Sequence, residues 1–156
     1  MTGQYHWDRN TPPMIEKLEF YHGAALVRLI EDPRCTRIAK HPCGYLVNEA
    51  RVVAIKYSTR AHSPWGFTFS QDDVTRINNA EKELNGCLVA LVCGGDGICV
   101  LFWATIAELL GNSPGRIAAK RGFAGCYAVS GPAGKMKGKV AMNSWPSIVF
   151  DGEIKP

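Results

Sequence analysis

The chain has 156 residues, which is enough for one compact domain with its own hydrophobic core. Hydrophobic residues make up 46% and charged residues 21%, so the composition excludes a chain that is disordered throughout. No apolar run is long enough to cross a membrane, and the first ten residues lack the basic start and apolar core of a secretory signal. These features predict a cytoplasmic protein without a membrane partner.

The first predicted element is a helix over residues 12–30. Thr11-Pro12-Pro13 is typical of a helix start, because proline fits the first helical turn, and Asp32-Pro33 marks the end. The apolar residues that recur at helical spacing are Ile15, Leu18, Ala25, Leu26 and Leu29. We expect this helix to cover one face of a sheet.

Several short strands are predicted next. Residues 36–40 form a candidate strand, and residues 45–48 and 51–58 are apolar or alternating, with a tight connection between them. Residues 67–69 are also strand-like. We expect residues 45–48, 51–57 and 67–69 to be consecutive antiparallel strands of one sheet.

A helix is predicted after these strands, because Ser70 and Asp73 fit a capping box. Its apolar side comprises Val74, Ile77 and Leu84, and Gly86 ends it. Residues 87–93 and 98–103 then predict a hairpin around a Gly-Gly-Asp-Gly turn. Thr105 and Glu108 form a second capping box, which predicts a short helix up to Gly111.

The character of the sequence changes after residues 112–115, beyond which it is basic and rich in predicted strands. We predict that these four residues form the seam between two parts of a single domain spanning residues 1–156. Residues 126–130 and 135–142 predict a second hairpin, and residues 148–150 a last strand. Strands are grouped more than alternated with helices. The predicted class is therefore α+β or mixed α/β, with a central mixed sheet, an N-terminal helix and a second helix after the long hairpin.

Charge is unevenly distributed along the chain. Residues 1–114 carry 11 Lys and Arg against 12 Asp and Glu, a net −1, whereas residues 115–156 carry seven against two, a net +5. A basic C-terminal third is typical of contact with nucleic acid or another acidic partner. A solvated basic surface explains the same pattern.

The six cysteines match no common zinc pattern. Cys35, His41 and Cys43 come closest, with the spacing C-x5-H-x-C. Four cysteines lie in apolar segments that are predicted to be strands, and we expect them to be small core residues. Cys93 and Cys99 flank the predicted hairpin turn, where they could face each other and would stay reduced in the cytoplasm.

Lys56 is unusual, because a charge inside an apolar strand is costly unless it is solvated or paired. The layout around it resembles the restriction-endonuclease-like, PD-(D/E)XK, nuclease superfamily over residues 12–103. That resemblance implies a Mg²⁺ site for phosphodiester cleavage, with a carboxylate pair and a lysine. Ala54 stands where the Glu of Glu-x-Lys belongs, and Asn48 or Glu49 stands where the Asp belongs.

The candidate catalytic set is accordingly Lys56, Glu49, Asn48 and Glu19, the last from the first helix. Alanine cannot bind a metal, so we predict no metal near Lys56 and an acid such as Glu49 or Glu19 paired with it. The layout of the whole sequence is also similar to that of a group of small bacterial proteins, a resemblance that implies no particular reaction.

Two further segments are candidates for nucleic-acid contact. In the loop before residue 67, Arg60 and His62 could contact phosphate and Trp65 could stack a base; alternatively, the loop is a simple turn and Trp65 covers the edge of the core. The basic residues that predict a phosphate-tracking patch are Lys135, Lys137 and Lys139, together with Arg116, Lys120 and Arg121. The alternative is that the lysines protect an edge strand.

Two hypotheses follow. The first is a protein that associates with DNA or RNA through a degenerate or unorthodox nuclease-like site, with Mg²⁺ as cofactor only if cleavage is retained. The second is a non-enzymatic module that binds or regulates another protein. The sequence defines no oligomeric state.

Overall fold

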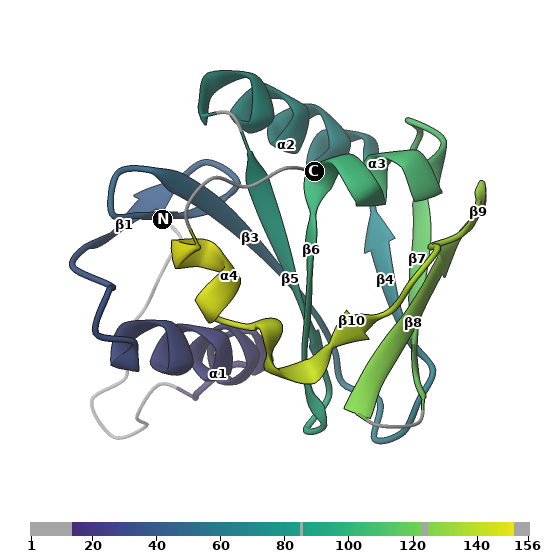
Figure 1. Ribbon diagram of the computed structural model, residues 1–156, viewed down its shortest axis with the longest axis horizontal. Helices are drawn as coiled ribbons and strands as arrows, with labels where there is room; N and C mark the ends of the chain where they lie inside the picture. Colours follow the sequence, from purple (N-terminus) through teal and green to yellow (C-terminus); the bar gives the residue numbers. More distant parts are fainter. Residues whose placement is uncertain (1–13, 85, 123–124, 152–156) are drawn as a thin grey trace.

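The computed structural model describes residues 14–84, 86–122 and 125–151, and the account below concerns these residues. They form an α+β fold with two β-sheets (Figure 1). Sheet A contains β1 (Ile38–His41), β2 (Gly44–Val47), β3 (Arg51–Ser58), β5 (Cys87–Cys93) and β6 (Gly97–Phe102). Sheet B contains β4 (Trp65–Phe69), β7 (Gly115–Arg121), β8 (Cys126–Gly131), β9 (Gly134–Lys135) and β10 (Val140–Ala141).

Five helical segments accompany the sheets. They are α1 (Lys17–Glu31), α2 (Gln71–Leu84), α3 (Trp103–Leu110), the 3-10 turn η2 (Met142–Ser144) and α4 (Ser147–Phe150). Helix α1 begins later than predicted, with Glu16 as its N-cap and Glu19 closing a capping box. The predicted start at Pro12 and Pro13 lies outside the described residues.

Sheet A is mixed, as predicted, with the strand order β1-β2-β3-β5-β6. The predicted hairpin of β2 and β3 is confirmed, and Tyr45 lies opposite Val53. Strand β3 then runs parallel to β5 over seven residue pairs, from Val52 with Cys87 to Ser58 with Cys93. The hairpin predicted for residues 87–93 and 98–103, which are β5 and β6, is also confirmed. All seven residues of β5 are buried, because this central strand is covered on both faces.

The molecule is layered around sheet A (Figure 1). Helices α1 and α4 lie against one face, where Val53 and Ile55 join their apolar cluster. Helices α2 and α3 and sheet B lie against the other face, which holds the larger cluster. Side chains alternate along β3, so Ala54 and Lys56 point toward α2 and sheet B, away from α1. The prediction that the first helix covers one face of the sheet is confirmed.

The prediction that residues 67–69 continue the same sheet is wrong. Strand β4 belongs to sheet B, where Phe67 lies opposite Ile117 of β7. Its apolar residues Trp65, Phe67 and Phe69 are all buried, between the two sheets. Strands from both sides of residues 112–115 therefore pair in one sheet. The seam at these residues and the single domain stay predictions.

Three local predictions in the C-terminal half are also wrong, wholly or in part. The helix α3 begins at Trp103 without a side-chain cap, so Thr105 and Glu108 do not form its capping box, although Gly111 does end it in a left-handed conformation. The predicted hairpin of residues 126–130 and 135–142 is only partly present: Lys135 pairs with Ser130, but β9 stops there, and the chain pairs with β8 again only at Val140–Ala141, after Gly138 with φ +85°. Residues 148–150 are helical, within α4.

Helix α1 is unusual in being apolar on its outer side as well. The large exposed apolar side chains of the described chain lie on α1 and just before it: Met14, Ile15, Leu18, Phe20, Val27 and Ile30. Among the described helices, none combines the length and apolar character that crossing a bilayer requires.

Candidate functional site

Lys56 and Asp73 form an ion pair where β3 faces the start of α2. The Lys56 Nζ lies 2.6 Å from the Asp73 Oδ2, and roughly a quarter of each side chain is exposed. Lys56 Nζ also lies 5.1 Å from the centre of the Phe69 ring, within cation–π range. The strand lysine that the sequence leaves unexplained is therefore neutralised by a residue 17 positions later.

The capping box of α2 holds Asp73 in place. The Ser70 side chain accepts the Asp73 N–H at 3.1 Å, and Asp73 Oδ2 accepts the Ser70 N–H at 2.9 Å, as the sequence predicts. Burial alone would raise the pKa of the Asp73 carboxyl, but hydrogen bonds from Lys56 and Ser70 outweigh it and hold this pKa below its ordinary value. Asp73 is thus a fixed carboxylate at neutral pH.

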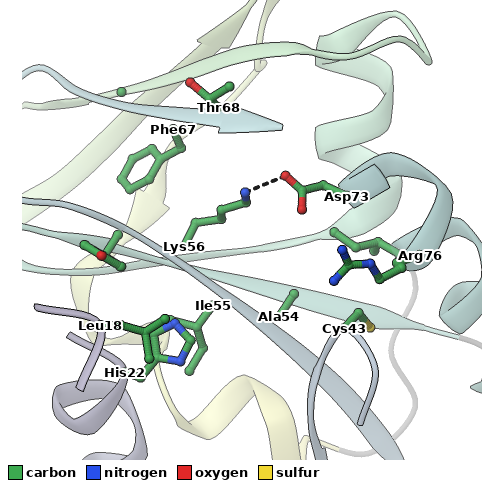
Figure 2. Close-up of a pocket in the computed structure, with 13 residues that line it drawn as sticks. Leu18, His22, Cys43, Ala54, Ile55, Lys56, Phe67, Thr68, Asp73 and Arg76 are labelled. Atoms are coloured by element: carbon green, nitrogen blue, oxygen red, sulfur yellow. Dashed lines mark hydrogen bonds and ion pairs between the residues drawn. The ribbon is translucent and has the colours of Figure 1, made fainter. Parts of the chain in front are cut away.

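A pocket of about 510 Å³ opens beside this ion pair. It lies between two strand edges, because β2 pairs with β3 only as far as Val53 and β4 is the last strand of sheet B. Figure 2 shows Lys56 pointing toward Asp73, with Arg76 beside Asp73 on α2 and Cys43 beyond Arg76. Two cations, Lys56 and Arg76, line the pocket against the single carboxylate of Asp73.

Helix α1 contributes Leu18 and His22 to the pocket wall (Figure 2). His22 Nδ1 shares a hydrogen bond of 3.0 Å with the Tyr45 hydroxyl. Burial lowers the pKa of the His22 ring, so the ring is neutral at pH 7. His22 therefore contributes a hydrogen bond to this wall and no charge.

The predicted partners of Lys56 lie elsewhere, so the prediction that Glu49 or Glu19 pairs with it is wrong. Glu49 forms an ion pair with Arg37, and Glu19 accepts the Glu16 N–H at 2.8 Å at the start of α1. Both carboxylates therefore bind partners other than Lys56.

Asn48 is likewise a structural residue. It occupies the turn between β2 and β3 with φ +54°, a conformation that asparagine tolerates. Its side-chain oxygen accepts the backbone N–H groups of Thr36 and Arg37, at 2.8 and 3.1 Å. Asp73, the partner that was missed, carried a signal in the sequence, because the capping box had already placed it at the start of α2.

The Mg²⁺ site that the nuclease resemblance implies does not fit these residues. Ala54 offers no ligand atom, the Asn48 side-chain oxygen accepts the Thr36 and Arg37 N–H groups, and Glu49 pairs with Arg37. The one carboxylate that lines the pocket, Asp73, is held by Lys56. Among the described residues, no three His, Cys, Asp or Glu side chains converge as metal ligands.

The loop between β3 and β4 combines exposed cations with a buried tryptophan. Arg60 and His62 are exposed, as phosphate contact would require. Trp65 is 2% exposed, and its Nε1–H donates to the Arg60 carbonyl at 2.9 Å. Trp65 therefore cannot stack a base, and the alternative, that it packs at the edge of the core, is confirmed.

The basic residues of sheet B form a separate surface. Lys135, Lys137 and Lys139 are all exposed, but they do not alternate along one strand, because β9 stops at Lys135. Lys120 and Lys139 line a shallow depression on the outer side of β7 and β8, and Lys135 borders it. Arg121 forms an ion pair with Asp96 at 3.4 Å.

Comparisons of the chain with protein-family models, with curated proteins and with solved structures find no match.

Proposed function

We propose that the protein binds nucleic acid through the phosphate backbone, on the outer face of sheet B. Five exposed cations of this region take part in no ion pair with any described residue: Arg116, Lys120, Lys135, Lys137 and Lys139. This uncompensated charge is the observation that carries the proposal, because a phosphate backbone is the polyanion such a surface attracts most strongly.

The strand register places three of these cations on one face. Arg116 lies opposite Thr68, Lys120 opposite Ala128, and Lys135 opposite Ser130, each pair on neighbouring strands. The residues between them are small: Gly66, Ala118, Ala128 and Ser130. Small side chains let a ligand backbone approach closely, while the longer cations reach around it. None of these strand residues is aromatic, so we expect binding through phosphates with little sequence preference.

The basic face continues toward the Lys56 pocket. The Arg116 guanidinium occupies the space that a Cβ on Gly66 would need, and Gly66 lines the pocket. At that end Lys56 pairs with Asp73 and Arg76 with Asp72, so the uncompensated positive charge comes from the exposed cations of sheet B, beginning at Arg116.

The arrangement of sheet A also supports the nucleic-acid reading. Helices α1 and α2 lie on opposite faces of a mixed sheet whose third strand carries a central lysine, which is the layout that the PD-(D/E)XK resemblance implies. The metal-binding carboxylates of that superfamily are not in place: Ala54 stands at the Glu position, and of Asn48 and Glu49, the candidates for the Asp position, Asn48 is neutral and Glu49 pairs with Arg37. We therefore propose binding without metal-dependent cleavage at Lys56.

Fluorescence anisotropy with a labelled DNA duplex of mixed sequence, over a range of salt concentrations, tests this proposal. We expect log Kd to change with log salt by about 0.9 per phosphate contact. Replacing Arg116, Lys120 and Lys135 together by alanine should lower the slope by roughly two to three units and weaken binding at low salt at least tenfold.

The matched control is the triple alanine variant of Arg28, Lys40 and Lys82. These cations are also exposed and take part in no ion pair with a described residue, but they lie on α1, β1 and α2. The control should keep the slope of the unmodified protein. No binding at low salt, or equal losses in both triple variants, would contradict the proposed surface.

A further inference from the structure

A cysteine, a histidine and a second cysteine meet at the end of the pocket opposite Lys56. The Cys43 Sγ lies 3.4 Å from the His41 Nδ1, and Cys43 lines the pocket (Figure 2). Cys43 packs against the buried cluster that contains Cys87, the first residue of β5. A thiol and a base thus meet at the pocket wall with a second thiol in the cluster behind them, and Cys87 is only 1% exposed.

His41 is oriented to accept the Cys43 proton. The His41 Nδ1 lies 3.2 Å from the Cys43 backbone N–H and 3.4 Å from the Cys43 Sγ, and its single lone pair must release the backbone N–H when it takes the thiol proton. The Nε2 side faces Glu83, whose carboxylate lies 3.9 Å away and would favour the imidazolium once the proton has moved. A nucleophile beside a base that a third group favours is the arrangement of an activated thiol.

The pKa values of the two thiols are shifted in opposite directions. Hydrogen bonds from Cys87 and from His41 outweigh burial and lower the pKa of the Cys43 thiol to about 6. The hydrogen bond to Cys43 and burial raise the pKa of Cys87 well above its ordinary value. Cys43 is the reactive thiolate at neutral pH, and Cys87 is its protonated neighbour.

We propose that Cys43 and Cys87 are a peroxide-reactive thiol pair, in which Cys43 attacks a hydroperoxide, His41 takes the thiol proton and Cys87 closes a disulfide. An accessible thiolate beside a second cysteine is the arrangement that allows reversible oxidation. This inference is independent of nucleic-acid binding, since it uses no residue of sheet B.

The chemistry balances in two steps. In the first, the Cys43 thiolate attacks one peroxide oxygen, an S–O bond forms, the O–O bond breaks, and the leaving alkoxide or hydroxide takes the proton held by His41. In the second, the Cys87 sulfur attacks the sulfenic sulfur, an S–S bond forms, the S–O bond breaks, and water leaves with the Cys87 proton. The two thiols lose two electrons, which the hydroperoxide gains.

The pH dependence of alkylation tests the activated thiol. Iodoacetamide labelling, mapped by mass spectrometry, should give a midpoint near pH 6 for Cys43, well below the ~8.5 of an unperturbed cysteine in a model peptide. The midpoint is the better readout, because intrinsic nucleophilicity falls with the pKa and partly cancels a rate advantage at pH 7.

The Cys43 sulfur contacts His41, and the charged groups around it are Arg76 in the same pocket, Glu83 beside the His41 ring and Glu81 at the Cys87 backbone. His41→Asn should raise the midpoint by one unit or more, because the amide oxygen can still accept the Cys43 N–H but cannot hold the proton. Cys87→Ala should raise it as well. An unshifted midpoint in His41→Asn would overturn the role of the base.

Treatment with stoichiometric hydrogen peroxide tests the pair. We expect a Cys43–Cys87 disulfide in the unmodified protein, and a dimedone-trapped sulfenic acid on Cys43 in Cys87→Ala. In Cys43→Ala, Cys87 should remain a free thiol. Oxidation of Cys35 at the rate of Cys43, or sulfenic acid that persists while Cys87 is present, would overturn the proposal even if the alkylation midpoint is low.

Discussion

The two ends of the pocket place charge in opposite ways. At one end Lys56 and Asp73 are both ionised and neutralise each other across 2.6 Å. At the other end the Cys43 Sγ and the His41 Nδ1 lie 3.4 Å apart, close enough for a proton to pass between them. A fixed ion pair contributes to stability and resists titration near pH 7, whereas a thiol–imidazole pair can change its charge distribution there. The comparison separates a structural end from a chemically responsive end.

The largest effect should come from breaking the fixed pair. Asp73→Ala leaves the Lys56 ammonium partly buried without its partner and also removes the acceptor for the Ser70 N–H. We expect a loss of about 2–3 kcal/mol in the free energy of unfolding, from the uncompensated charge and the lost cap together. Urea denaturation followed by circular dichroism measures it.

The neighbouring carboxylate provides the matched control. Asp72 is 84% exposed and meets only Arg76, at 3.5 Å. Its replacement by alanine should change stability by less than about 0.5 kcal/mol, as for most exposed helical pairs. Equal losses in Asp72→Ala and Asp73→Ala would mean that the Lys56–Asp73 contact contributes little in solution.

A smaller effect should follow from replacing the cation. Lys56→Met keeps the length of the side chain and its packing on Phe69, but leaves the carboxylate of Asp73 with only the Ser70 hydrogen bond. We expect a loss of about 1–2 kcal/mol. The double variant with Asp73→Asn should recover part of it, because removing both partners leaves no unpaired charge. Strictly additive losses would contradict an interaction between the two side chains.

The pH dependence of stability should also separate the two ends. Because the folded-state pKa of Asp73 lies below its unfolded value of ~3.9, its contribution is present above about pH 4 and is lost as the pH falls through the lowered pKa. The difference in melting temperature between the unmodified protein and Asp73→Asn should therefore shrink between pH 5 and pH 2. A difference that stays constant would show that the carboxylate charge is not what stabilises this end.

Much of sheet A follows from local sequence. Alternation in β2 and β3 and the turn at Asn48 predict their hairpin, and the Gly-rich turn predicts the pairing of β5 with β6. These contacts connect residues close in the chain, so hydrophobic pattern and turn chemistry suffice to find them. The mixed character of the sheet was predicted from the order of the elements and the nuclease resemblance, and its parallel pair, β3 with β5, has no local signal.

Sheet B was predicted less well, because its pairing is distant in sequence. Phe67 pairs with Ile117, fifty residues later, and nothing in the local pattern of β4 distinguishes this partner from β3. Likewise, the Ser70–Asp73 box was found, but its consequence for Lys56 depends on β3 ending beside α2. The Cys43–Cys87 contact is hidden for the same reason, since forty-four positions separate the two thiols.

The smallest expected effect, and the one that joins the two ends, is the restoration of a metal site with Ala54→Glu. Ala54 lies on the same side of β3 as Lys56 and lines the same pocket as Asp73 and Cys43. An added carboxylate would compete for the lysine, release Asp73 and supply the second oxygen donor that a divalent ion needs. We expect weak Mn²⁺ binding by calorimetry in the variant and none in the unmodified protein.

The double variant Ala54→Glu with Asp73→Asn is the control, because it adds the new carboxylate but removes the existing one. It should bind Mn²⁺ more weakly than Ala54→Glu alone. Circular dichroism establishes that each variant is folded, since Ala54 is only 5% exposed and a buried charge is costly. If folded Ala54→Glu gains no Mn²⁺ affinity, the match to Glu-x-Lys is a coincidence of strand composition, and Lys56 serves the fold through Asp73 alone.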